Sequence, residues 1–300
     1  MIDQPSTSLE QPQSKHPQRS IYSAQNLSQL PGVLVRSEGS PPVDDLDVNN
    51  VYDHLGIVIR FYQKVFARNS IDGNGQDLVA TVHYEKEFAN AFWNGAQLVF
   101  GDGDGKIFAR FTEAVDVTAH ELAKGVIKSE VGLQYISQAG ALVTSIADVF
   151  GALTKQYALG QTVEQADWLI GAGLLKKGLA LRSMKSPGTA YDDPTLGKDP
   201  QPAHMKNYVK TSHDNGGVHI NSGVPSHAFY LCATKIGGYS WEKAGKIWYE
   251  TLRDSRLRPN TGFRRFAALT VEQAGALFGQ DSVERRAVRE AWKEVGIAIR

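Results

Sequence analysis

The sequence has almost no cysteine, no excess of charge of either sign and no long hydrophobic run. Its one cysteine in 300 residues, Cys232, excludes an internal disulfide and a cysteine-rich zinc site. It lies in the apolar stretch AFYLCA, which predicts a buried core thiol. Lys plus Arg and Asp plus Glu each number 32, so charge does not indicate a nucleic-acid or an anionic membrane partner. No apolar run approaches the ~20 residues of a membrane-spanning helix. We therefore expect no nucleic acid and no membrane as partners.

The N-terminus also lacks the apolar core of a secretory signal peptide. Residues 1–20, MIDQPSTSLEQPQSKHPQRS, hold eleven Gln, Pro or Ser. We therefore expect a cytoplasmic or intracellular location, with unconventional export as the alternative. Residues 1–18 bury too little apolar surface to offset the entropy of ordering, which predicts a disordered tail, with the remnant of a prosegment as an alternative.

Apolar residues make up 42% of the chain and charged residues 21%, as in soluble globular proteins. Apolar spacing of three and four predicts helices over 51–66, 114–129, 139–156, 223–236, 241–255, 263–278 and 281–296. Short β-type runs predict strands within 77–84, 96–102 and 106–111. The stretch 183–217 is typical of loops. This order predicts an α+β fold, with a β-rich N-terminal lobe over 19–134 and a helical C-terminal lobe over 135–300.

The helix predicted over 114–129 contains VTAHELAKGV at 117–126. His120 and Lys124 lie four residues apart and share one face, while Glu121 is displaced by about 100°. A second histidine at position 124 would complete an HExxH zinc signature. On spacing alone, an ordinary buried helix face is the commoner interpretation.

Four ordered blocks change that interpretation. They are NAFWNGAQLVFGDGDG (90–105), DVTAHELAKGVIKSEVGLQYISQAGALVTSIADVFGAL (116–153), ALRSM (180–184) and DNGGVHINSGV (214–224). Together they resemble the thermolysin-like metallopeptidases, most of all the protealysin-like branch, over about 19–296. The resemblance implies a two-lobed thermolysin-like fold with the active-site cleft between the lobes, in agreement with the predicted elements.

The resemblance also implies a zinc site, which this sequence matches only in part. Zinc in the family is held by two histidines and a glutamate, and these positions fall on His120, Lys124 and Thr144. The aspartate that steadies the first histidine matches Asp148. A catalytic zinc site needs three protein ligands, whereas an ammonium has no lone pair and repels a dication. We therefore expect no bound zinc.

The other functional positions of the family are retained. The resemblance implies a general base at Glu121 and two groups that stabilise the oxyanion, Tyr135 and His219, with Asp214 orienting His219. It implies contacts to the substrate backbone from Asn90 and Ala91, and contact with the substrate carbonyl from Arg182, beside Leu181.

The calcium positions of the family are also altered. Asp116 matches one acidic ligand, but Lys155 stands at another, and Leu169 and Ala172 offer no side-chain oxygen. Calcium needs six or more oxygen ligands, so we expect none here. The GDGDG stretch at 101–105 lacks the spacing of a calcium loop and predicts a glycine-rich hairpin or a bend.

Two interpretations of Lys124 remain open. In the first, its ammonium replaces the charge of zinc and pairs with Glu121. In the second, a lysine in a shielded cleft is a base, an acid or a Schiff-base nucleophile, with Glu121, His219 and Tyr135 as proton-transfer partners. A neighbouring carboxylate favours the charged lysine and hence the first interpretation.

Three hypotheses for function follow. The first is a pseudopeptidase that keeps a peptide-shaped cleft for a binding or regulatory role. The second is a repurposed, metal-independent enzyme that acts on a small molecule or a peptide-like intermediate through Lys124, Glu121, Tyr135 and His219. The third is a residual zinc metalloendopeptidase. Each predicts a peptide or small-molecule ligand in the interlobe cleft, and the sequence does not indicate an oligomeric state.

Overall fold

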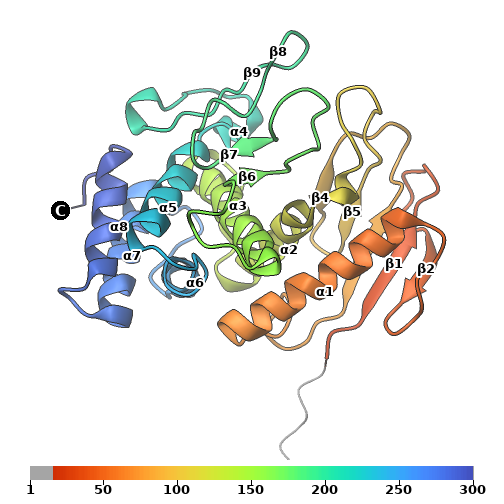
Figure 1. The fold of residues 1–300 in the computed structure, drawn as a ribbon, viewed down its shortest axis with the longest axis horizontal. Coiled ribbons are helices and arrows are strands. Elements are labelled where there is room, and N and C mark those ends of the chain that lie inside the picture. Colours follow the sequence, from red (N-terminus) through yellow and green to blue (C-terminus); the bar gives the residue numbers. More distant parts are fainter. Residues whose placement is uncertain (1–15, 300) are drawn as a thin grey trace, which may run out of the picture.

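The computed structural model describes residues 16–299 and shows a β-containing N-terminal lobe beside a helical C-terminal lobe (Figure 1). Residues 1–15 of the predicted tail lie outside the described residues. At Gln18, the last residue of the predicted tail, the backbone N–H donates to Asp77 Oδ1 at 3.0 Å, and the carbonyl accepts from the Leu78 N–H. The chain therefore enters the fold already paired with the N-terminal sheet.

Within residues 16–299, the N-terminal lobe is built on a five-stranded sheet of order β2-β1-β3-β5-β4. Its strands are β1 (Arg19–Ser23), β2 (Val33–Ser37), β3 (Leu78–Val82), β4 (Ala91–Trp93) and β5 (Leu98–Phe100). The pairs β1/β3 and β3/β5 are parallel, and the outer pairs β1/β2 and β4/β5 are antiparallel. The strand β4 is consequently an edge strand, with one side free of strand pairing.

The strand predicted at 106–111 is wrong. Asp104 Oδ1 accepts the backbone N–H groups of Lys106, Ile107 and Phe108, each within 2.9 Å, so a side chain takes the bonds that a ladder would use. The segment is a loop with one isolated bridge, from Phe108 to Leu175. Of the hairpin or bend predicted for GDGDG, the structure shows a bend at Gly105.

The helices follow the predicted periodicity closely. They are α1 (Leu46–Phe66), α2 (Val115–Glu130), α3 (Ser137–Leu159), α4 (Asp214–Gly217), α5 (Gly223–Ile236), α6 (Ala244–Leu252), α7 (Phe263–Phe278) and α8 (Val283–Glu294). Two 3₁₀ turns, η1 (Phe111–Glu113) and η2 (Met205–Asn207), and four two-residue strands complete the order: β6 (Leu169–Ile170), β7 (Arg182–Ser183), β8 (Asp192–Asp193) and β9 (Gly197–Lys198). No helix in the described part of the chain is long and apolar enough to cross a membrane.

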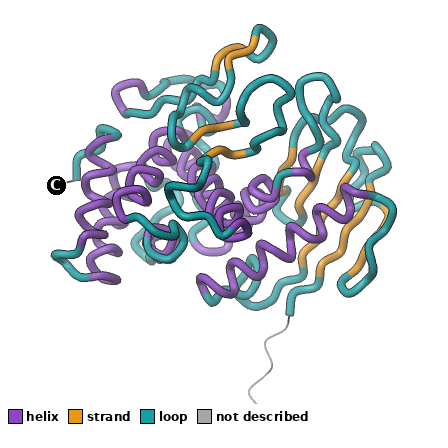
Figure 2. The backbone as a smooth tube through the Cα atoms, viewed as in Figure 1, coloured by secondary structure: helices purple, strands orange, loops and turns teal. Residues whose placement is uncertain are grey.

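Helices α2 and α3 form the centre of the molecule, between the sheet with α1 on one side and α5, α6, α7 and α8 on the other (Figure 2). A Cβ added at Gly151 of α3 would lie 2.6 Å from the Asp116 carbonyl oxygen, so glycine permits the close crossing of the two helices. Residues 116–123 of α2 are all buried. The predicted core thiol, Cys232, is likewise fully buried.

A charged cluster joins the first turn of α1 to the loop after β5. His83 Nε2 lies 2.9 Å from Asp45 Oδ2, and His83 Nδ1 lies 2.8 Å from Asp102 Oδ1. Hydrogen bonding to Asp102, opposed by burial and supported by Asp45, raises the pKa of His83 to about 9. Asp45 also caps α1 by accepting from the Asp47 and Val48 N–H groups. His83 therefore links the helix cap to the loop as an imidazolium.

We expect His83→Asn to lower the free energy of unfolding by about 1–2 kcal/mol at pH 6, because two charge-assisted hydrogen bonds are lost. The pKa of about 9 lies above the ordinary value, so the stabilisation is complete below about pH 6.5 and is lost as the pH rises through 9. Asparagine is used because residue 83 has a φ of 54°. Urea denaturation from pH 6 to 10 measures the difference, and a difference that grows with pH would contradict the assignment.

Candidate active-site cleft

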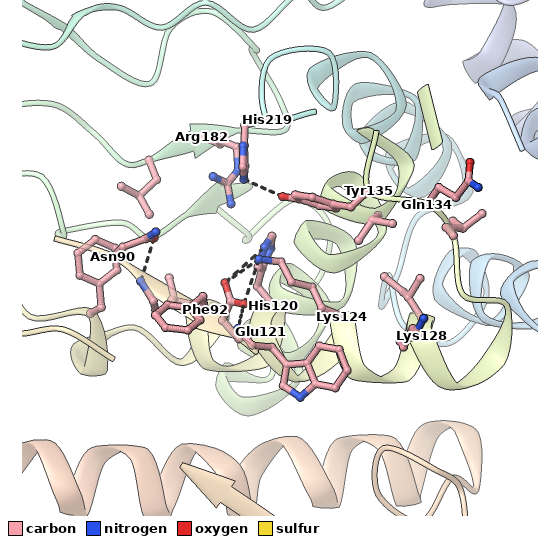
Figure 3. A pocket seen from close by; sticks show the side chains of 18 of the residues that line it. Asn90, Phe92, His120, Glu121, Lys124, Lys128, Gln134, Tyr135, Arg182 and His219 are labelled. Carbon is pink, nitrogen blue, oxygen red and sulfur yellow. Dashed lines mark hydrogen bonds and ion pairs between the residues drawn. The ribbon is translucent and has the colours of Figure 1, made fainter. Parts of the chain in front are cut away.

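A cleft with a volume of about 630 Å³ lies between the lobes (Figure 3). Its walls come from β4, from α2, from the loop after α2, from β7 and from the turn that carries His219. Nine residues predicted from the sequence line it: Asn90, Ala91, His120, Glu121, Lys124, Tyr135, Leu181, Arg182 and His219. The other three, Thr144, Asp148 and Asp214, contact these residues from behind.

Glu121 and Lys124 form an ion pair within the cleft. Lys124 Nζ lies 3.0 Å from each carboxylate oxygen of Glu121. The backbone N–H of Trp93, in β4, donates to Glu121 Oε2 at 2.8 Å. The side chains of Lys124 and Glu121 are only 17% and 5% exposed, so water screens the pair weakly. This geometry supports the charge-replacement interpretation of Lys124.

A second group of charges lies behind this pair. Arg182 donates from Nε and Nη2 to the two oxygens of Asp148, each at 2.7 Å, which is a bidentate pair. Burial alone would raise the pKa of Asp148, but Arg182 and then His120 hold it well below its usual range. The sequence analysis predicted the contact of Asp148 with His120 but not its pairing with Arg182. Because Arg182 donates from Nε and Nη2 to Asp148, these two groups are not available to a ligand in the cleft.

His120 faces both charged groups. Its Nδ1 lies 2.8 Å from Asp148 Oδ1, close but not aligned as a hydrogen bond, and its Nε2 lies 3.8 Å from Glu121 Oε1. Burial and then the charge of Lys124 lower the pKa of His120. Both causes favour the neutral form of the imidazole.

Tyr135, His219 and Asp214 form a hydrogen-bonded chain on the opposite wall. The Tyr135 hydroxyl lies 2.9 Å from His219 Nε2, and His219 Nδ1 lies 2.5 Å from Asp214 Oδ1. The left-handed backbone of Asp214, Asn215 and Gly216 lets Asp214 also accept the His219 backbone N–H at 2.7 Å. Asp214 thus fixes the ring of His219, as the resemblance implies, and leaves Nε2 for the tyrosine hydroxyl.

A lysine lies at the position that matches a calcium ligand of the family. Lys155 Nζ lies 3.2 Å from Asp116 Oδ2, 2.9 Å from Asp167 Oδ1 and 2.7 Å from the Leu169 carbonyl oxygen. Burial raises the pKa of Asp116, and the charge of Lys155 opposes that rise. The ammonium therefore balances carboxylates on two segments.

Several cleft residues were missed from the sequence. They are Phe92, Trp93, Phe111, Val117, Ile127, Lys128, Gly132, Leu133, Gln134 and Val143. Phe92 and Trp93 directly follow Asn90 and Ala91, and that position is the signal that would have found them. The donation from the Trp93 backbone to Glu121 has no such signal, because the two residues are 28 positions apart.

The side chains in the cleft can be compared with those needed to hold the zinc ion of the family. His120 Nε2 and the Glu121 carboxylate offer ligand atoms to the cleft, but Lys124 offers an ammonium. The Thr144 hydroxyl is buried and directed at the Gly140 carbonyl and Tyr135. Among residues 16–299, three carboxylate or imidazole ligand atoms come within 4.8 Å of one another only at Asp45, Asp47 and His83. These side chains do not fit a three-ligand zinc site, and we derive no catalytic step through a metal.

Several known proteins are similar to this chain in sequence, and one solved structure is similar to it in fold. An "Extracellular metalloprotease" of Pectobacterium carotovorum subsp. carotovorum is 55% identical over 285 residues, which cover 94% of this chain and 82% of that protein. "Protease PrtS" of Photorhabdus sp. (strain Az29) is 53% identical over 287 residues, covering 94% and 77%. The structure of the precursor of protealysin, a metalloproteinase from Serratia proteamaculans, matches with a TM-score of 0.93 and 55% identity, over 97% of this chain and 91% of that one.

These relatives contradict two expectations. We expected neither zinc nor calcium, but similar proteins are metalloproteases, so that expectation is withdrawn. We expected a cytoplasmic or intracellular location, but two relatives are named as extracellular, so this expectation is withdrawn as well. The poor fit of Lys124 and Thr144 to a metal is a property of two side chains and does not establish that the protein lacks a metal.

Two family domains account for nearly all of the chain. Residues 21–128 match the catalytic domain of the thermolysin metallopeptidases, and residues 131–297 match their alpha-helical domain. The boundary between the matches lies at the end of α2, where the two lobes meet. The predicted two-lobed thermolysin-like fold is confirmed, and the chain belongs to the thermolysin metallopeptidase family.

Proposed function

We propose that this chain is a peptide-binding member of its family, a pseudopeptidase whose cleft has a binding or regulatory role. The observation that carries the proposal is the ion pair between Lys124 and Glu121. Both oxygens of Glu121 are engaged, by Lys124 and by the Trp93 N–H, so its carboxylate is poorly placed to activate water. The pair instead forms a neutral part of the cleft wall.

The shape and lining of the cleft support a peptide as the ligand. The strand β4 is an edge strand and lines the cleft, so an extended peptide can pair alongside it. Phe111, Val117 and Leu181 provide an apolar surface for one peptide side chain. Asn90, exposed at the start of β4, is placed to hydrogen-bond the peptide backbone.

We expect a fluorescent peptide to bind saturably and to be recovered uncut. Asn90→Ala should weaken binding about tenfold, because one or two hydrogen bonds are lost. Asn207→Ala, an exposed asparagine outside the cleft, is the matched control and should bind as the wild type does. Fluorescence anisotropy measures affinity, and mass spectrometry checks the peptide. Cleavage would instead support the zinc metalloendopeptidase hypothesis, and an absence of binding would contradict the proposal.

One observation favours the second hypothesis, a metal-independent enzyme. Tyr135 and His219 line the cleft together with Lys124, and Asp214 holds His219 from behind, so this hydrogen-bonded chain could move a proton. Glu121→Gln and His219→Ala distinguish the hypotheses once any conversion of a ligand is found. Loss of that conversion in both variants supports the enzyme, and an unchanged rate in both excludes it.

A further inference from the structure

Two cations of the cleft keep hydrogen-bond donors that the described residues do not use. Lys124 has three N–H groups, and in residues 16–299 its one hydrogen-bonding partner is Glu121, which leaves at least one N–H free. Arg182 uses Nε and Nη2 on Asp148, and its Nη1 makes no hydrogen bond within the same residues. Both side chains line the cleft. The cleft therefore presents unused, charged donors.

The two donors come from different walls. Lys124 lies on α2, and Arg182 comes from β7 on the other side of the opening, beside His219 (Figure 3). Each cation is held in place by a partner that is itself fixed. Glu121 is anchored by the Trp93 N–H, and Asp148 is fully buried in α3. A ligand group between the walls would meet donors that are already oriented, so little ordering entropy would be lost.

The charged side chains that line the cleft favour an anionic ligand. Lys124, Lys128 and Arg182 face the cleft. The carboxylates at or behind its wall are those of Glu121, Asp148 and Asp214, and Asp214 is paired with His219. Lys128 has no ion pair within residues 16–299. A ligand carboxylate would accept from the unused donors of Lys124 and Arg182, and charge-assisted hydrogen bonds in a shielded cleft are stronger than neutral ones.

We propose that the cleft selects peptides by a carboxylate, which binds between Lys124 and Arg182. The carboxylate is that of a peptide C-terminus or of an acidic side chain, which share the same chemistry. This inference rests on the proposed function and names its ligand class. Lys124 is then a specificity-determining residue, and the side chain that replaces a family histidine makes a new anion subsite.

The test compares peptides of one apolar sequence in four forms. These are the free acid, the C-terminal amide, and two amides that differ by Glu or Gln at one position. We expect the wild type to bind a carboxylate-bearing form at least tenfold more tightly than its neutral partner, as a difference of one charge-assisted bond implies. The pair that shows the preference identifies the source of the carboxylate.

Lys124→Met should reduce this preference to less than twofold, and Lys124→Arg should keep it. Lys64→Met is the matched control, since it removes an exposed lysine of α1 outside the cleft and should leave the preference intact. Lys124→Met combined with Glu121→Gln tests the same point without a stranded carboxylate, if the single variant unfolds.

The possible results separate the two proposals. Equal binding of all four forms, or a preference that survives in Lys124→Met, overturns the carboxylate subsite and leaves peptide binding standing. If none of the peptides binds, the proposed function and the inference both fail. A preference that is lost only in the Lys124→Met variants establishes the subsite.

Discussion

Replacing Lys124 with histidine and Thr144 with glutamate in one chain should raise zinc affinity at least about 1,000-fold over the wild type. The change removes an ammonium that repels the ion and adds two ligands near His120. Histidine at 124 lies one turn from His120 on α2, and glutamate at 144 lies on α3, which packs directly on α2. Asp148 Oδ1 lies 2.8 Å from His120 Nδ1, where a carboxylate can orient the first ligand.

Zinc competition with a chromophoric chelator measures this gain, and metal analysis of the dialysed protein gives the stoichiometry. Each single variant should fall well short of the double variant, because a site with two protein ligands remains incomplete. Lys128→His is the matched control, since it places a histidine one turn further along α2. A folded double variant within tenfold of the wild type would show that the lobes no longer bring the three positions together.

Arg182→Met is expected to lower the free energy of unfolding by about 3 kcal/mol, because it leaves the buried carboxylate of Asp148 without its bidentate partner. Burial and then the charge of Lys124 lower the pKa of His120 in the native protein, which opposes its taking the place of Arg182. Methionine preserves most of the volume, so the loss of charge dominates. Urea denaturation followed by circular dichroism measures the change.

The comparison for Arg182 is an exposed pair. Arg253 contacts Glu250 one turn away, and the two side chains are 48% and 36% exposed, so Arg253→Met should cost less than about 1 kcal/mol. Arg182→Met combined with Asp148→Asn should recover part of the lost stability, because no unpaired charge remains. Equal costs for the two single variants would mean that Asp148 is solvated in the native protein.

Local apolar spacing predicted the helices, and the resemblance of four sequence blocks predicted the family. The predicted ranges 223–236 and 263–278 coincide with α5 and α7, because apolar spacing along a helix reports directly which face is buried. The strands β1, β2 and β4 were missed, since each is five residues or shorter and two of them lie at sheet edges. The prediction of a strand at 106–111 was wrong because the side chain of Asp104 accepts the backbone N–H groups of residues 106, 107 and 108.

The contacts of the site also fall into those that the sequence could predict and those that it could not. The pairing of Glu121 with Lys124 follows from their spacing of three on one helix, so it could be foreseen. The chain alone could not show that Trp93 anchors Glu121, or that Arg182 turns two donors to Asp148. Those contacts join residues 28 and 34 positions apart. They exist because β4, α2, α3 and β7 meet at one cleft, and long-range packing, which no local period encodes, brings them there.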